Sequence, residues 1–186
     1  MKTFRILFLG YKKNDTKLIS FFRKKKFIVI ENGQKILSSK NLSIYDLIIS
    51  YGYKRIIKKK ILKQLKRPPI NLHISYLPYN KGSDPNYWSF KEKTPSGITI
   101  HEIDSGVDTG NIIYRKKIEF KNKKNQTLKS TYWTLRREIE RLFLKKYKEI
   151  ANNTYKSFKV KTIGTYHKKT DLKINKRNWN IKISEI

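Results

Sequence analysis

The chain has 186 residues, enough for one domain with its own hydrophobic core, and its 38% hydrophobic content argues against a disordered basic tail. It contains no cysteine, which excludes disulfides, Cys-ligated zinc and a thiol nucleophile. No apolar run approaches the roughly 20 residues that span a bilayer, and the N-terminus does not resemble a secretion signal. We therefore expect a cytoplasmic protein without a membrane partner.

The formal net charge of +30 is unevenly distributed. Lysine supplies 35 of the 44 basic residues, and lysine is a poorer reader of phosphates and bases than arginine. Residues 71–113 carry a net charge of −2 and hold four of the eight glycines, so the segment with the most unusual backbone is not the basic one. We interpret the charge first as a solvated lysine coat, then as attraction for an anionic substrate, and last as nucleic-acid binding.

The first half of the chain alternates short apolar runs with helical patterns. Unbroken apolar runs of this length indicate strands that are buried on both faces, as in a parallel sheet with helices on both sides. Strands are predicted over residues 4–9, 27–30, 45–50 and 70–74, and helices over 16–26 and 55–65. The second helix is expected to stop before Pro68 and Pro69, because the residue before a proline disfavours the helical conformation.

The second half begins with a long loop after Ser75, in which residues 89–91 are expected to be helical. Strands are predicted over 97–102 and 112–120. Apolar residues spaced three to four apart over 127–150 predict the longest helix. The signal weakens after Ala151, and neither a repeat nor a linker marks a second domain.

Three polar residues stand out where the predicted strands end. Asn71 and His73 are two apart on a strand, so both side chains project from the same face. Asp108 lies in a segment with two glycines within five residues, which indicates a tight loop. Because open α/β sheets bind ligands at the carboxyl ends of their strands, we expect these three side chains to converge on one ligand.

An amide, an imidazole and a carboxylate suit acyl transfer without a covalent intermediate, since the first two stabilise an oxyanion and the third manages a proton. The sequence has no G-x-S-x-G elbow, P-loop or dinucleotide fingerprint, and its three histidines are too scattered to predict a metal site. Considered singly, each of the three residues is more typical of a structural role, and His101 is interpreted as packing on a strand edge.

Several spaced motifs together resemble the signature of the folate-dependent formyltransferases. This family includes glycinamide ribonucleotide transformylase, the catalytic domain of methionyl-tRNA formyltransferase and the amino-sugar N-formyltransferases. The resemblance covers residues 4–120 in order. The motifs are Asn71-Leu72-His73-Ile74-Ser75-Tyr76-Leu77-Pro78, Lys81-Gly82, Gly97-Ile98-Thr99-Ile100-His101 and Asp108-Thr109-Gly110-Asn111-Ile112-Ile113.

The resemblance implies an α/β, Rossmann-like formyltransferase fold with a mostly parallel sheet and helices on both faces. Residues 1–150 would form the catalytic domain, and 151–186 a C-terminal extension on or near the substrate pocket. N10-formyltetrahydrofolate would be the formyl donor, with Asn71, His73 and Asp108 at the catalytic positions. The residues matching the family's pterin-binding segments are Tyr53, Arg55, Ile56, Ile57, Asp104 and Val107.

The segment 82–88 and the tail 164–169 resemble those of small formyltransferases that act on surface-polysaccharide sugars. The resemblance thus implies that the acceptor is a nucleotide-linked 4-amino-4,6-dideoxyhexose. The candidate substrate contacts are Lys12, Lys81, Asp84, Trp88 and His167, with core packing as the alternative for Trp88. Methionyl-tRNA is disfavoured because the barrel domain of its formyltransferases is not recognised. Glycinamide ribonucleotide and a non-catalytic RNA-binding role are further alternatives, and the oligomeric state, a homodimer included, stays open.

Overall fold

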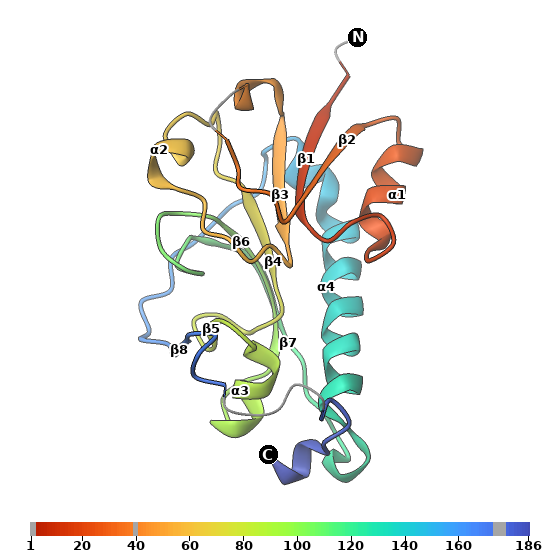
Figure 1. Ribbon diagram of the computed structural model, residues 1–186, viewed down its shortest axis with the longest axis vertical. Helices are drawn as coiled ribbons and strands as arrows, with labels where there is room; N and C mark the ends of the chain where they lie inside the picture. Colours follow the sequence, from red (N-terminus) through yellow and green to blue (C-terminus); the bar gives the residue numbers. More distant parts are fainter. Residues whose placement is uncertain (1–2, 39–40, 173–177) are drawn as a thin grey trace.

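The computed structural model describes residues 3–38, 41–172 and 178–186, and a six-stranded sheet lies at its centre (Figure 1). The strand order is β2-β1-β3-β4-β6-β7. The strands are β1 (Arg5–Gly10), β2 (Ile28–Gly33), β3 (Leu47–Tyr51), β4 (Ile70–His73), β6 (Gly97–Glu102) and β7 (Ile112–Lys117). The pairs β2–β1, β1–β3 and β3–β4 are parallel, whereas β4–β6 and β6–β7 are antiparallel. This confirms the predicted mostly parallel, Rossmann-like sheet.

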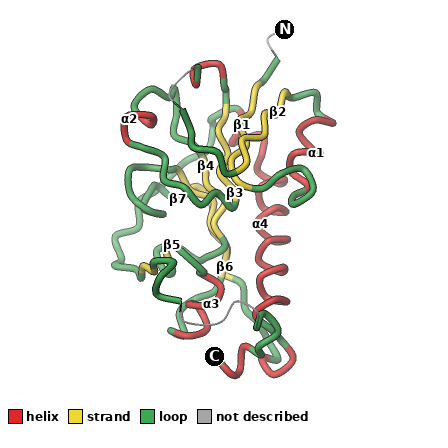
Figure 2. Tube along the Cα trace, in the orientation of Figure 1, coloured by secondary structure: helices red, strands yellow, loops and turns green. Residues whose placement is uncertain are grey.

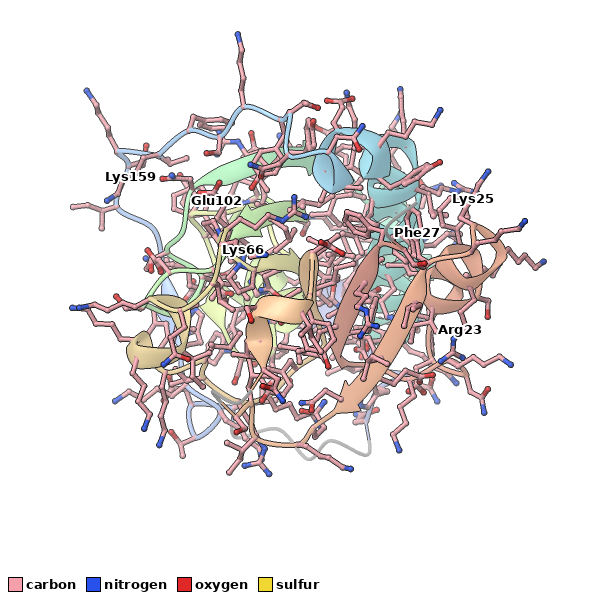
Figure 3. The ribbon with its side chains drawn as sticks, turned by 90° about the horizontal axis from the view of Figure 1, so that it is seen from above. Arg23, Lys25, Phe27, Lys66, Glu102 and Lys159 are labelled. Carbon is pink, nitrogen blue, oxygen red and sulfur yellow. The ribbon has the colours of Figure 1, made fainter. Side chains whose placement is uncertain are left out.

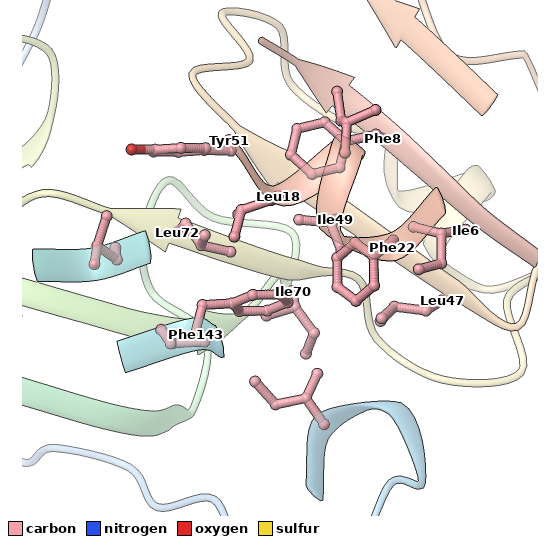
Figure 4. Packing of buried hydrophobic residues seen from close by; sticks show 14 of the residues in the cluster. Ile6, Phe8, Leu18, Phe22, Leu47, Ile49, Tyr51, Ile70, Leu72 and Phe143 are labelled. Carbon is pink, nitrogen blue, oxygen red and sulfur yellow. The ribbon is translucent and has the colours of Figure 1, made fainter. Parts of the chain in front are cut away.

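Helices cover both faces of the sheet, as predicted. Helix α1 (Lys17–Lys24) and the long helix α4 (Leu128–Ala151) pack on one face, where Phe22 and Phe143 meet edge to face. Figure 4 shows these side chains interleaving with the strand residues. The short helix α2 (Lys59–Leu62) contributes Ile61 to a second apolar cluster, which lies on the other face. Burial of these two clusters provides the main driving force for the fold.

The two long helices begin at side-chain caps. Thr16 caps α1 by accepting a hydrogen bond from the backbone N–H of Leu18. Thr127 and Ser130 form a reciprocal capping box at the start of α4. Such caps satisfy backbone donors that have no partner within the helix.

The predicted helix over 55–65 is wrong in extent, because α2 spans only Lys59–Leu62. Lys58 precedes it without a side-chain cap, and neighbouring lysines bring like charges together on so short a helix. Residues 53–58 are not helical, and Ile57 is buried instead against the strands. The non-helical segment leaves its backbone beside a cavity described below.

The predicted helical segment at 89–91 is too short, because α3 begins four residues earlier and spans Pro85–Lys91. Pro85 suits the first helical position, since its missing N–H would be unpaired there and its ring presets φ. Two two-residue strands were not predicted: β5 (Lys81–Gly82) pairs in parallel with β8 (Tyr166–His167). Such short strands have no periodicity to detect, and this pairing joins residues 85 positions apart in sequence.

Replacing Gly10 by alanine should lower the free energy of unfolding by more than the roughly 1–3 kcal/mol of a strained backbone position. Gly10 has φ +99°, and a Cβ there would lie 2.0 Å from the carbonyl oxygen of Tyr51. Gly33→Ala is the matched control, because Gly33 also has positive φ but its nearest atom is a flexible lysine carbon at 3.4 Å. Urea titration of both variants measures the difference, and equal losses would contradict the close packing at Gly10.

Lysine side chains project outward around the molecule, as seen from above (Figure 3). Lys25 and Lys159 are both exposed and lie on widely separated parts of the surface. This distribution agrees with a solvated lysine coat. Among the described residues, no helix combines the length and the apolar character that crossing a membrane requires.

Candidate active site

Strand β4 presents Asn71 and His73 on one face and Leu72 on the other, as the alternation predicts. Leu72 is buried in the core between the sheet and α4, and His73 is 8% exposed. His73 Nε2 lies 3.2 Å from the carbonyl oxygen of Asn80 and 3.6 Å from Asp108 Oδ2. Both neighbours are acceptors, so Nε2 carries a proton.

The loop between β6 and β7 brings Asp108 to the end of β4. Asp108 adopts the left-handed conformation with φ +53°, which aspartate tolerates better than most residues. Its Oδ2 accepts a hydrogen bond from the N–H of Gly82 at 2.8 Å, and its Oδ1 accepts one from Asn71 Nδ2 at 3.1 Å. The predicted convergence of Asn71, His73 and Asp108 is therefore present in the structure.

His101 is a fourth member of this cluster, although its position in the sequence was interpreted as mere strand packing. The antiparallel register of β4 and β6 places His101 directly opposite Asn71. His101 Nε2 lies 3.1 Å from Asn71 Nδ2 and 3.4 Å from Asp108 Oδ1, and the residue is only 1% exposed. The available signal was the alternation of Gly97–Glu102, but that pattern does not reveal which strand lies alongside.

The surroundings of the cluster favour an ionised Asp108 and a neutral His73. Burial by itself raises the pKa of Asp108, but the nearby imidazoles of His73 and His101 and the N–H of Gly82 together hold it well below its usual value. Burial lowers the pKa of His73, and the attraction of Asp108 only partly offsets this. Within the described ranges, no three histidine, aspartate or glutamate side chains are arranged to hold a metal ion.

A cavity of about 1000 Å³ adjoins the cluster, at the upper end of the range for small-molecule sites. All six residues predicted to bind the pterin line this cavity: Tyr53, Arg55, Ile56, Ile57, Asp104 and Val107. Gln34 holds their first segment in place, because its side chain donates to the carbonyl of Gly52 and accepts from the N–H of Lys54. Asp104 accepts hydrogen bonds from Gly106 and Thr109, which stabilise the second segment.

Of the five predicted substrate contacts, three line the cavity and two do not. Lys12, Asp84 and His167 line the cavity, whereas Lys81 and Trp88 are not among the lining residues. Lys81 belongs to the β5–β8 pair, and its backbone N–H bonds to the carbonyl of Thr165. Trp88 stacks on His167 with ring centroids 4.0 Å apart and an interplanar angle of 6°. Trp88 therefore packs against the ring face of His167, which itself lines the cavity.

A cluster of aromatic residues around Arg136 also lines the cavity and was not predicted. The buried guanidinium of Arg136 donates from Nε to the hydroxyl of Tyr51 at 3.1 Å and lies 4.0 Å from the ring centre of Tyr11. The hydroxyls of Tyr11 and Tyr132 are 2.7 Å apart, and Trp179 meets Tyr132 edge-on at 5.0 Å. We call Tyr11, Tyr132 and Trp179 the aromatic wall.

After α4 the described part of the chain is mostly loop, apart from β8 and a 3₁₀ turn at Ile183–Glu185 (Figure 2). Phe158 bridges to Ile112 of β7, and the carbonyl of Trp179 accepts a hydrogen bond from the N–H of Lys129 in the first turn of α4. Cavity-lining residues from this extension are Tyr166, His167, Lys168, Lys169, Leu172, Asn178 and Trp179.

Comparison with known proteins identifies relatives of this chain. Residues 12–145 match the family model "Formyl transferase". The formyltransferase PseJ from Anoxybacillus kamchatkensis, solved with UDP-4,6-dideoxy-4-formamido-L-AltNAc and tetrahydrofolate, is 39% identical. It superimposes with a TM-score of 0.87 over 97% of this chain and 96% of that one.

Two further relatives are less identical in sequence, and this chain covers a smaller share of each of them. WlaRD, a sugar 3N-formyl transferase, shares the fold with a TM-score of 0.79 at 23% identity, covering 92% of this chain and 72% of that one. The methionyl-tRNA formyltransferase of Prochlorococcus marinus (strain MIT 9215) is 32% identical over 89% of this chain and 56% of its own length. The chain thus spans about half, or less, of the curated relatives that it matches.

Proposed function

The chain belongs to the formyl transferase family, and we propose that it transfers the formyl group of N10-formyltetrahydrofolate to the amine of a nucleotide-linked 4-amino-4,6-dideoxyhexose. The observation that carries the proposal is the cluster of Asn71, His73 and Asp108 in the wall of a cavity of about 1000 Å³. Complexes of PseJ with tetrahydrofolate and a UDP-linked formamido sugar support both substrate classes.

The cavity wall fits a folate on the side of Tyr53–Ile57. Ile56 and Val107 offer apolar surface to a pterin, and Ile56 is 72% exposed. The non-helical backbone of this segment offers hydrogen-bonding groups to the polar edge of the ring. The folate supplies the formyl carbon, which these contacts would hold beside the cluster.

The residues of the cluster then have separate tasks in the transfer. The neutral acceptor amine attacks the formyl carbon, forming a C–N bond while the carbonyl electrons move to the oxygen. Asn71 and the protonated Nε2 of His73 stabilise this oxyanion. Asp108 accepts the proton that leaves the amine, and collapse of the intermediate breaks the bond to N10 of the folate, which takes up a proton.

The cavity also has features that bind a nucleotide. Lys12, Lys168 and Lys169 line it and can attract a diphosphate. Trp179 of the aromatic wall is 40% exposed, so its indole can stack on a base or a sugar. A cationic and aromatic surface of this kind favours a nucleotide-linked acceptor over a small neutral amine.

Methionyl-tRNA is the second candidate acceptor, because the curated relatives are methionyl-tRNA formyltransferases and the chain carries a net charge of +30. The two candidates are separated by incubating the protein with N10-formyltetrahydrofolate and either a panel of amino-sugar nucleotides or methionyl-tRNA. We expect an amino-sugar nucleotide to gain the mass of one carbonyl unit. Formylation of methionyl-tRNA alone would overturn the proposed acceptor.

The KM for the nucleotide-linked acceptor should rise with ionic strength, because salt screens the attraction between lysines and a diphosphate. Lys168→Ala should raise this KM and flatten its salt dependence, while leaving the KM for the folate unchanged. Lys159→Ala is the matched control, since Lys159 is exposed but does not line the cavity. Initial rates at several salt concentrations measure both effects, and a salt-independent KM would contradict lysine-based recognition.

A further inference from the structure

The hydrogen bonds of His101 define which of its nitrogens carries a proton. Nδ1 lies 2.7 Å from the backbone carbonyl oxygen of Glu102, which can only accept, so Nδ1 is the donor. A Cβ at Gly110 would lie 1.8 Å from that same oxygen, so the Asp108-Thr109-Gly110 motif leaves room for this carbonyl. In the neutral imidazole, Nε2 therefore has a free lone pair directed into the cluster.

Asn71 has both of its amide hydrogens engaged in this state. One is donated to Nε2 of His101 at 3.1 Å, and the other to Oδ1 of Asp108 at 3.1 Å. Turning the amide around would place its oxygen against the carboxylate, which repels it. With both hydrogens committed, Asn71 has no donor to offer to a formyl oxygen.

Protonation of His101 removes this obstacle. The new Nε2–H donates to Oδ1 of Asp108, which lies 3.4 Å away, and no longer accepts from Asn71. One N–H of Asn71 is then free to turn to the oxyanion. The step that brings the amine proton to His101 is therefore also the step that frees Asn71 to stabilise the negative oxygen.

We propose that His101 is a positioning residue that takes up the proton leaving the acceptor amine, by way of Asp108, and thereby releases an N–H of Asn71 to the formyl oxygen. This inference rests on the proposed function. In the proton balance, the amine loses one proton, the carboxylate passes it on and stays ionised, and the imidazole becomes imidazolium. The proton later leaves His101 by the same route when N10 of the folate is protonated.

The charges around His101 agree with this role. From β4, His73 faces it edge-on with ring centroids 6.2 Å apart, and from the β6–β7 loop Asp108 supplies the negative charge that stabilises an imidazolium. On its own strand, the Glu102 carboxylate is occupied by Tyr155 and Asn111.

The tautomer can be tested without any acceptor substrate. The chain has three histidines, so ¹⁵N-imidazole NMR of the labelled protein gives three ring systems, assigned with His101→Gln and His167→Gln. We expect neutral His101 as the Nδ1–H tautomer. An Nε2–H tautomer for His101 would overturn the inference, whatever the enzyme formylates.

Kinetics test the proton transfer. His101→Gln can place an amide oxygen near the Nε2 position and accept from Asn71, but it takes up no proton. We expect kcat to fall by about 10²-fold, within the usual range for lost acid–base catalysis, with both KM values nearly unchanged. Because wild-type His101 takes up a proton and glutamine cannot, the pH profile of kcat should differ between the wild type and this variant.

His101→Asn is the matched variant, because it keeps a donor for the Glu102 carbonyl but leaves Asn71 without its partner. We expect its kcat to lie above that of His101→Gln and below that of the wild type, because an N–H of Asn71 is then free but no proton is taken up. Circular dichroism checks that both variants fold. Wild-type kcat and an unchanged pH profile in His101→Gln would overturn the inference. If the wild-type protein formylates no acceptor, the proposed function fails, and the NMR result alone decides the tautomer on which the inference depends.

Discussion

Replacing Asp108 by asparagine should lower kcat for formyl transfer by about 10²–10⁴-fold, the range expected for removing a general base. The Asp108 carboxylate accepts from Gly82 and Asn71 and faces both His73 and His101. An amide of the same shape can still accept from Gly82, so the loop keeps an anchor. It cannot take the proton from the amine.

Unfolding measured against pH provides the control for this variant. The pKa of Asp108 is lower in the folded protein than in the unfolded chain, so its contribution to stability is present above the ordinary carboxyl pKa and is lost as the pH falls toward the folded value. Asp108→Asn should lack this part of the acid dependence while remaining folded at neutral pH. Turnover within a few-fold of wild type would contradict the assignment of Asp108.

Truncating either oxyanion donor, as Asn71→Ala or His73→Ala, should lower kcat by about 10²–10³-fold, because each donor acts mainly on charge that develops in the transition state. The KM for the folate should change little, since the predicted pterin contacts come from other segments, Tyr53–Ile57 and Asp104–Val107. Steady-state kinetics with the folate varied at a saturating acceptor concentration separates the two constants.

Ser75→Ala is the matched control for these variants. Ser75 follows β4 closely, is 2% exposed, and its hydroxyl has no hydrogen-bond partner among the described residues. We expect full activity, because direct attack by the amine needs no serine nucleophile. An inactive but folded Ser75→Ala, or a nearly active His73→Ala, would show that the chemistry runs through different groups.

Much of the site could be predicted because it depends on local pattern. Asn71 and His73 are two apart on an apolar strand, and alternation alone places them on one face. The glycines around Asp108 indicate a tight loop, and the structure has Asp108 itself at positive φ. The helix over 55–65 failed for the opposite reason, since its composition allowed a helix but tertiary contacts buried Ile57 and left only four helical residues.

Local sequence patterns were sufficient to predict the strand–helix alternation, the long helix and the placement of Asn71 and His73 on one face, because each depends on residues a few positions apart. Only the tertiary structure decided that His101 faces Asn71 and that Trp179 meets Tyr132. The first depends on the antiparallel register of β4 and β6, and the second on packing between distant segments. Register and packing depend on the burial of whole faces of the sheet and helices. A pattern of a few residues carries no information about which faces meet.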